Sequence, residues 1–408
     1  MLMSKILLCV SGGIAAYKAI DLASRLQKTG YEIRTVLTQN ALRFVSALNF
    51  SAITGGSVHS SLFDDADPIP HIHLADWADL IVIAPATANL IAKAAHGLAD
   101  DLCSTILLAH TKPRLWIPAM NVNMYSHPAT EANLATLKAR GDHVLEPVTG
   151  LLACGYAGKG KYPPNEEVEA AINCYLKYGK DLEGIRVLLT AGAGEEPIDP
   201  MRKLTNNSSG KMGIALARAL ALRGAKVRLV HGRISVSVPY YLEEAVEAND
   251  AHTMLEAVMS RRQDADWIIK CAAVSDFTPL NKELSKIPKQ TSLQLELIST
   301  PDILAMLGTM KAPGQKLIGF AAQTEDLIKN AKAKLKKKRL DMICANLLKT
   351  AGQDSTEIVV IKANHSNKNA YAHLSGTKDE VAHAIIDHIK SLDIEKHDRD
   401  MELDTHDG

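Results

Sequence analysis

The sequence is poor in aromatic residues, in cysteine and in long hydrophobic runs. Only 4% of its 408 residues are Phe, Trp or Tyr, so a core must be built from aliphatic side chains. The six cysteines are irregularly spaced and include no CxxC pair, which argues against a disulfide framework and a structural zinc site. No apolar run approaches the roughly 20 residues of a membrane-spanning helix. These absences predict a soluble, cytoplasmic protein without a membrane segment.

Neither sign of charge is in excess. Lys and Arg together number 46, as do Asp and Glu, which gives a formal net charge of zero. A uniform positive field that would bind nucleic acid through its phosphates is therefore lacking, and we expect no nucleic-acid partner. The chain does have length and apolar content: 408 residues with 47% hydrophobic character predict two or three globular domains.

Short apolar runs alternate with amphipathic stretches along almost the whole chain. Buried strands are predicted at 5–10, 31–37, 79–84 and 114–118, and a second series begins at residue 184. This alternation predicts parallel sheets covered by helices on both faces. The predicted fold class is α/β, with two doubly wound, Rossmann-like units. The predicted boundaries are 1–180 for the first unit, 181–395 for the second and 396–408 for a disordered polar tail.

Two small-residue turns in the first half follow predicted strands. Ser11, Gly12 and Gly13 lead into a helix, where backbone amides can bind a phosphate. The motif is not GxGxxG, so a mononucleotide such as FMN is favoured over a dinucleotide, and a plain tight turn is the alternative. The APATAN segment at 84–89 allows close approach of a planar ring, and Thr87 either caps a helix or contacts a ligand.

Three polar positions in the first half have catalytic potential. His71 and His73 could bind a metal together, or one histidine could act as a base, since its pKa lies near neutrality. Asn121 follows a strand and could bind a carboxylate, although an Asn in a turn is a common structural feature. Cys154 lies in a glycine-rich stretch and could deliver a proton from a mobile lid, or be a small buried hydrophobe.

The second half contains a candidate phosphate site. Residues 206–213, NNSSGKMG, combine hydroxyls, amides and a lysine at the start of a predicted helix. They do not form a Walker A loop, and a glycine-rich helix cap is the alternative. Asp276 lies in the segment CAAVSDF, at the end of a predicted strand, and could hold Mg²⁺ or a nucleotide hydroxyl, or cap a helix. The basic run 329–339 is predicted to be a solvated helix face, from which Lys338 could reach a triphosphate.

The ordered motifs SGGIAAYK, HIHLADWAD, APATANLIAK, PAMNVNMY and LLACG resemble the flavin-dependent cysteine decarboxylases. Over residues 4–390, both halves resemble the bifunctional phosphopantothenoylcysteine decarboxylase/phosphopantothenate–cysteine ligases of coenzyme A biosynthesis. The resemblance implies that His71 is the catalytic base and that Cys154 returns a proton to the product. It implies that Asn121 grips the substrate carboxylate within a clamp motif that includes Met124. It places Ser11, Gly12, Gly13, Thr38, Thr87 and Asn89 in FMN-binding stretches.

The motifs EPIDPMR, TNNSSGKMG, CAAVSDF, GFAAQT and ICAN resemble the ligase half of the same family. The resemblance implies that CTP, with Mg²⁺, activates the carboxylate of 4′-phosphopantothenate as an acyl cytidylate, which the amine of cysteine then attacks. Asn206 would stabilise that intermediate, and Lys286 and Lys289 would support activation. Ala273, Asp276, Phe320 and Lys338 fall in nucleotide-contact stretches.

Some residues depart from the family pattern. Pro288 interrupts the lysine motif, and Gln323 replaces an expected acid. Preference for CTP over ATP therefore stays open, as does the alternative of a decarboxylase with an altered or weak ligase half. Two other classes are a non-catalytic flavoprotein regulatory subunit and a nicotinamide-dependent reductase. The resemblance also implies a homo-oligomer, with trimers of the first unit, dimers of the second and a dodecamer as the result.

Overall fold

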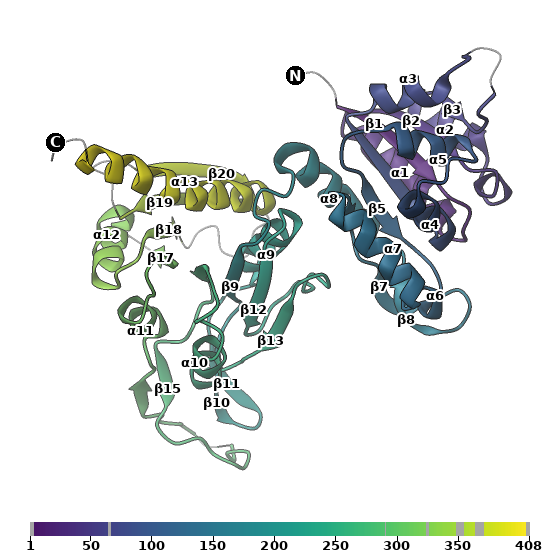
Figure 1. Ribbon diagram of the computed structural model, residues 1–408. Helices are drawn as coiled ribbons and strands as arrows, with labels where there is room; N and C mark the ends of the chain where they lie inside the picture. Colours follow the sequence, from purple (N-terminus) through teal and green to yellow (C-terminus); the bar gives the residue numbers. More distant parts are fainter. Residues whose placement is uncertain are drawn as a thin grey trace. The chain divides into compact units, whose positions relative to one another are not determined.

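A computed structural model describes residues 4–63, 67–289, 291–323, 326–347, 355–363 and 371–404. The chain divides into two compact units, residues 1–179 and 180–408, beside the boundary at 180/181 that the sequence suggests. Figure 1 shows the two units in sequence colours, the first from purple to teal and the second from teal to yellow. Among the described residues, no helix has both the length and the apolar character needed to cross a membrane.

The first unit is built on a six-stranded parallel sheet. Its strands in spatial order are β3 (Val58–His59), β2 (Glu32–Leu37), β1 (Lys5–Val10), β4 (Leu80–Ala86), β5 (Leu115–Pro118) and β6 (His143–Val144). The order reverses between β1 and β4, so the prediction of a doubly wound sheet is confirmed. Ligands of such sheets bind outside the carboxyl ends of the strands at this reversal, which is where the turns after β1 and β4 lie.

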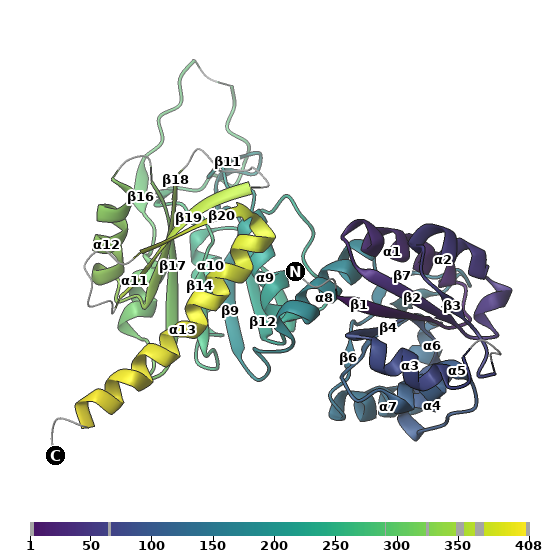
Figure 2. The same ribbon diagram turned by 90° about the horizontal axis from the view of Figure 1, so that it is seen from above.

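Helices cover both faces of this sheet, as Figure 2 shows. On one face, α1 (Ala16–Lys28) packs against α2 (Ala47–Thr54) and α8 (Asn165–Tyr178). On the other face, α3 (Pro70–Trp77), α4 (Ala88–His96), α5 (Leu102–Ala109) and α7 (Pro128–Ala139) share one core with β1, β4 and β5. The core is aliphatic, as predicted, with Trp116 and Phe50 among its few large aromatic side chains.

Three short elements lie at the carboxyl edge of the sheet, close to predicted site residues. The short helix α6 (Val122–Tyr125) follows β5 directly, and η1 (Ala41–Arg43) follows β2. The antiparallel hairpin β7 (Val148–Leu151) and β8 (Ala157–Lys161) carries Cys154 in its turn. At Gly160 an added Cβ would collide with the carbonyl of Met120, so glycine lets β8 lie against the residues after β5.

The second unit has an eight-stranded sheet. In spatial order it contains β13 (Glu244–Glu247), β12 (Lys226–His231), β9 (Arg186–Ala191), β14 (Trp267–Lys270), β17 (Lys316–Gln323), β18 (Met342–Leu347), β19 (Ser355–Lys362) and β20 (Tyr371–Thr377). The first six strands are parallel, whereas β19 and β20 are antiparallel. The predicted α/β unit with a parallel sheet is confirmed for these six strands, and two antiparallel strands are added at one edge. The connecting segments 348–354 and 363–370 are shorter than the crossover of about a dozen residues that parallel pairing needs.

Two helical layers and two small hairpins complete this unit. Helices α9 (Lys211–Leu222) and α13 (Lys378–Asp404) share a core on one face of the sheet. Helices α10 (Ala251–Met259), α11 (Ile303–Thr309) and α12 (Leu327–Lys337) cover the other face. The hairpins are β10 (Glu195–Asp199) with β11 (Arg202–Thr205), and β15 (Phe277–Pro279) with β16 (Leu297–Ser299).

Helix α13 extends further than the sequence analysis suggests. It continues to Asp404, so residues 396–404 are helical where a disordered tail was expected, and residues 405–408 lie outside the described part. This segment lacks Gly and Pro and continues a helix that is already nucleated, which makes further helical residues less costly.

Candidate active sites

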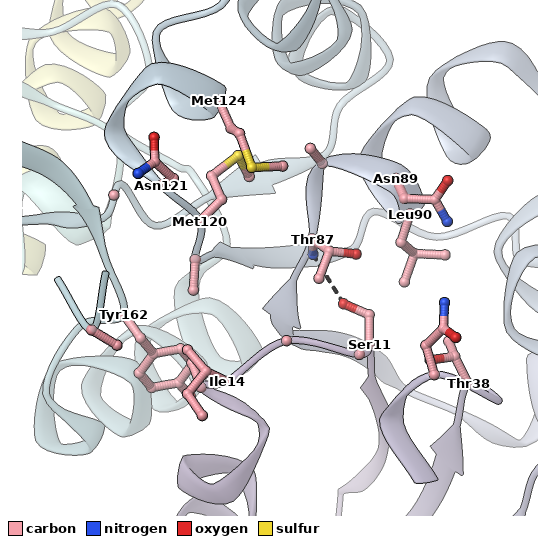
Figure 3. Close-up of a pocket in the computed structure, with 18 of the residues that line it drawn as sticks. Ser11, Ile14, Thr38, Thr87, Asn89, Leu90, Met120, Asn121, Met124 and Tyr162 are labelled. Atoms are coloured by element: carbon pink, nitrogen blue, oxygen red, sulfur yellow. Dashed lines mark hydrogen bonds between the residues drawn. The ribbon is translucent and has the colours of Figure 1, made fainter. Parts of the chain in front are cut away.

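The first unit contains a cavity of about 1020 Å³ at the carboxyl ends of β1, β4 and β5. It is lined by nine of the predicted site residues, and Figure 3 shows several of them facing one space. The nine are Ser11, Gly12, Gly13, Thr38, Thr87, Asn89, Asn121, Met124 and Cys154. Residues up to 143 positions apart in the sequence thus meet at the predicted edge of the sheet.

Ser11 joins the turns that follow β1 and β4. Its buried hydroxyl donates a hydrogen bond to the carbonyl of Pro85 (2.7 Å) and accepts one from the backbone N–H of Thr87 (2.9 Å; Figure 3). A Cβ at Gly12 would collide with Asn40, so glycine permits the close approach of these loops. The first turn of α1 has no side-chain cap, but the backbone N–H groups of Ala16 and Lys18 already donate to the carbonyls of Gly13 and Ala15, so an anion would bind to the remaining amides of this turn.

The other wall can accommodate a flat group. Thr87 is the N-cap residue of α4, but its side chain makes no capping hydrogen bond. Its hydroxyl and the exposed amide of Asn89 line the cavity instead, above the small residue Ala88. The first-turn amides of α1, the glycines and this wall together fit a planar ring that carries a phosphate group.

Asn121 and Cys154 meet at the entrance of the cavity. Asn121 caps α6 by accepting a hydrogen bond from the backbone N–H of Asn123 (2.9 Å), which fixes its amide. The amide Nδ2 then lies 3.2 Å from Cys154 Sγ. Hydrogen bonds from the backbone N–H of Tyr156 and from Asn121 hold the pKa of the exposed Cys154 below its usual value. A lowered pKa makes this thiol a better proton donor than an ordinary cysteine.

His71 does not line this cavity, although it belongs to the same unit. It lies in the first turn of α3, half-buried, and its Nδ1 is buried without a hydrogen-bond partner among the described residues. His73 is exposed and lies 3.0 Å from Asp67. The described residues hold no group of three metal-ligating side chains. The catalytic role of His71 therefore stays a prediction, because His71 does not line the cavity formed by its own chain.

In the second unit, Asn206 and Ala273 meet at the carboxyl ends of β9 and β14. Asn206 Nδ2 donates to the carbonyl of Ala273 (3.0 Å), which also accepts from the backbone N–H of Gly194 (2.9 Å). The hydroxyl of Thr205 donates to the carbonyl of Gly194 (2.8 Å). The predicted residues thus join the TNNSSGKMG and CAAVSDF segments through direct contacts.

The predicted nucleotide contacts Phe320 and Lys338 lie beside two residues that the sequence analysis did not single out. Lys338 Nζ lies 3.0 Å from the carboxylate of Asp302, which caps α11. Lys334 Nζ donates to the carbonyl of Phe320 (3.0 Å). Lys334 precedes Lys338 by four residues, and this helical spacing was the available signal. Burial, and then the charge of Lys338, lower the pKa of Lys334, which also senses Asp276.

The loop that carries Lys286 and Lys289 is anchored by a different hairpin. Both lysines are exposed, but the backbone N–H of Ile287 donates to Asp199 Oδ2 (3.1 Å). Asp199 also accepts from the guanidinium of Arg202 (2.8 Å). Burial raises the pKa of Asp199, but hydrogen bonds from the backbone and from Arg202 outweigh it and keep the pKa low.

Two predictions at this site remain untested. Asp276 is exposed and belongs to no group of three metal-ligating side chains within the described ranges, so its Mg²⁺ role stays a prediction. Gln323 ends β17, and its side chain lies outside the described part of the structure.

Each of the two units matches a known protein family. Residues 2–176 match the family described as flavoprotein, and residues 182–392 match the C-terminal domain of DNA/pantothenate metabolism flavoproteins. The coenzyme A biosynthesis bifunctional protein CoaBC of Bacillus subtilis is 45% identical over 95% of this chain and 97% of its own length. CoaBC of Mycobacterium tuberculosis is 39% identical over 94% and 96%.

Two solved structures are similar to single units. The crystal structure of a CoaBC C-terminal domain shares 37% identity, covers 52% of this chain and 97% of that one, and has a TM-score of 0.45. The FMN-binding protein AtHal3 shares 33% identity, covers 43% and 97%, and has a TM-score of 0.38.

Proposed function

Because the chain belongs to the family of coenzyme A biosynthesis bifunctional proteins, we propose that its two units catalyse successive steps on one small molecule. The second unit joins cysteine to 4′-phosphopantothenate, and the first decarboxylates the resulting 4′-phosphopantothenoylcysteine. The observation that carries the first activity is the contact between Asn121 and Cys154 at a cavity suited to a planar ring. For the second, it is the contact between Asn206 and Ala273 at the sheet edge.

FMN is the cofactor that suits the first cavity. The first-turn amides of α1 and the Ser11–Gly13 turn would hold its phosphate, with Thr38 nearby, and Thr87 and Asn89 would contact its ring. The bound flavin supplies reversible acceptance of a hydride, which an alkyl carboxylate needs because its carbanion is otherwise poorly stabilised.

The side chains around this cofactor bind substrate and move protons. Asn121, fixed by its capping bond, would orient the substrate carboxylate with Met124 beside it. Cys154 would deliver a proton from Sγ to the substrate carbon. His71 would act as the base. Since His71 does not line the cavity of its own chain, we assign it to the site of a neighbouring copy in a trimer.

The second unit would use CTP with Mg²⁺ to activate the carboxylate of 4′-phosphopantothenate. Activation is needed because a carboxylate is a poor acyl donor, and the mixed anhydride carries a good leaving group. Asn206 would bind the activated acyl group beside the amides of the Ala273 loop. Lys286 and Lys289 would neutralise developing negative charge, and Lys338, Phe320 and Asp276 would bind the nucleotide and its Mg²⁺.

Exposed apolar residues support dimers of the second unit. The segment between β15 and β16 projects from the unit in Figure 2. This segment and the first residue of β16 expose five leucines, a residue type that is usually buried. They are Leu280, Leu284, Leu293, Leu295 and Leu297, of which Leu284 is 93% exposed. A dodecamer, from trimers of one unit and dimers of the other, and a cytoplasmic location are parts of this proposal.

One coupled assay tests both activities. Purified protein receives 4′-phosphopantothenate, cysteine, Mg²⁺ and either CTP or ATP, and pyrophosphate and CO₂ are measured separately. We expect a yellow protein, pyrophosphate release that is faster with CTP, and CO₂ release that follows it. CO₂ from supplied 4′-phosphopantothenoylcysteine without pyrophosphate release would identify a decarboxylase with an inactive ligase half. A yellow protein that yields neither product would identify a non-catalytic flavoprotein.

A further inference from the structure

Lys270 is a lysine inside the second unit that neither the fold nor the proposed reaction yet explains. It is the last residue of β14, after the apolar residues Trp267, Ile268 and Ile269, and it is 7% exposed. Among the described residues it forms no hydrogen bond or ion pair. A buried, unpaired ammonium group is costly to fold, and sequences rarely retain one without a function.

The register of the sheet shows which way the Lys270 side chain faces. Lys270 pairs with Gly319 of β17, and side chains opposite each other in parallel strands lie on the same face. A Cβ at Gly319 would approach Leu304 of α11 and Leu340 after α12. Leu304 and Leu340 fill the space above Gly319, so Lys270 lies on the face of the sheet that α11 and α12 cover.

The groups on that layer are those of the candidate nucleotide site. Lys334 binds the carbonyl of Phe320, the residue next to Gly319, and Lys338 binds Asp302 at the start of α11. Together with Lys270, they form a cluster of three lysines near Asp302, and Asp276 also affects Lys334. Asp302 balances only part of this positive charge, so charged lysines so placed repel each other unless a further anion binds among them.

The electrostatic balance of Lys270 follows from this placement. Burial is the largest effect and lowers its pKa to about 7. The neighbouring Cys271 and Asp302 act in the opposite direction, whereas Lys334 and Lys338 lower the pKa further. Lys270 is thus substantially neutral above pH 7 in the free protein, and a bound polyanion would favour its charged form.

We propose that Lys270 is a nucleotide-binding residue of the second unit and takes up a proton from solvent when the polyphosphate of a nucleoside triphosphate binds. The proposal rests on the ligase function proposed above and adds a third, chargeable lysine to its nucleotide site. The ammonium formed on binding neutralises phosphate charge that Lys334 and Lys338 alone leave uncompensated. Nucleotide affinity should therefore fall as pH rises from 7 to 9.

Calorimetric titration of the full-length protein with CTP and Mg²⁺ tests this inference. At pH 8, in two buffers of different ionisation enthalpy, the wild type should take up protons on binding. The variant Lys270→Met, which has similar length and no charge, should bind CTP about tenfold more weakly and take up fewer protons. Lys270→Arg, which is permanently charged, should bind CTP without that uptake. Lys329→Met, at an exposed position of α12, is the matched control and should behave as the wild type.

Thermal unfolding without nucleotide gives an independent readout. The unfolded chain holds more protons than the folded chain between pH 7 and the ordinary lysine pKa of 10.5, so wild-type stability should rise with pH in this range. Lys270→Met should unfold at a higher temperature than the wild type at pH 7 and lack this contribution, because its buried side chain is apolar. Greater stability with weaker CTP binding is a combination that a purely structural lysine would not produce.

The outcomes separate the two proposals. If the wild type binds CTP and Lys270→Met matches it in affinity and proton uptake, the inference about Lys270 is overturned and the ligase function stands. If the wild type binds neither CTP nor ATP, the ligase function fails and the inference fails with it. The thermal unfolding transition of the same samples reports whether the second unit of each variant is folded.

Discussion

Both units bring predicted site residues together at the carboxyl edge of their parallel strands, but with different kinds of side chain. In the first unit, uncharged groups such as Ser11 and Asn121 are held by hydrogen bonds to backbone and line a cavity whose wall also includes Lys18, Lys93 and Lys161. In the second unit, Lys270, Lys334 and Lys338 converge at the edge with Asp302.

This difference corresponds to the ligands that each unit would bind. A flavin ring and a substrate carboxylate need a shaped site in which donors are fixed before the ligand arrives. A triphosphate carries several charges and needs compensating cations, which repel one another when the site is empty. We therefore expect the first unit to select its ligands mainly by the fixed positions of its hydrogen-bond donors, and the second unit mainly by its positive charge.

The largest effect should come from removing the proton donor of the first unit. We expect Cys154→Ser to lower decarboxylase turnover at least 100-fold, because a hydroxyl gives up its proton far less readily than this thiol. The oxidised enethiol intermediate should accumulate and be detectable by mass spectrometry, while pyrophosphate release stays unchanged. Tyr156→Phe, in the same turn, retains the backbone N–H and serves as the control. Normal CO₂ release by Cys154→Ser would remove the assigned role.

A smaller effect should appear in the second unit when the lysine loop is released. Asp199→Asn removes the charge that pairs with Arg202 and weakens the hydrogen bond from Ile287, so the loop with Lys286 and Lys289 loses its anchor. We expect the ligase rate to fall about tenfold, with decarboxylation unaffected. Glu283→Gln, at an exposed position near this loop, is the control. Equal ligase rates in the two variants would show that the anchor does not matter for catalysis.

The smallest effect should concern flavin retention. Ser11→Ala removes two hydrogen bonds that join the turns after β1 and β4, each contributing about 1 kcal/mol. We expect flavin to dissociate several-fold more readily, measured as 450 nm absorbance (roughly the flavin band) after dialysis. Ser51→Ala on α2 should retain flavin as the wild type does. If charge rather than geometry governed the first unit, high salt would release flavin more effectively than this substitution.

Much of the fold could be predicted because its signals are local. Continuous apolar runs such as 80–86 predict buried parallel strands, and the structure has β4 there, fully buried. The structure differs from the expectation at β19 and β20, where short connections decide the strand direction, and in α13, where a polar composition does not prevent a helix. Both differences depend on the elements next to the segment: the short connections before β19 and β20, and the helix that precedes residues 396–404. The composition of the segment itself does not decide them.

The sequence by itself determined which residue types stand at the ends of the strands, and its ordered motifs carried the family resemblance from which the two chemistries are expected. It could not determine which of these residues meet. Asn121 and Cys154 are 33 residues apart, and only the β7–β8 hairpin brings the amide to the thiol. Lys270 ends a strand that looks like any buried run, and only its pairing with Gly319 shows that the lysine faces the nucleotide layer. Side-chain identity is local information, whereas electrostatic and hydrogen-bonding partners depend on distances that exist only after folding.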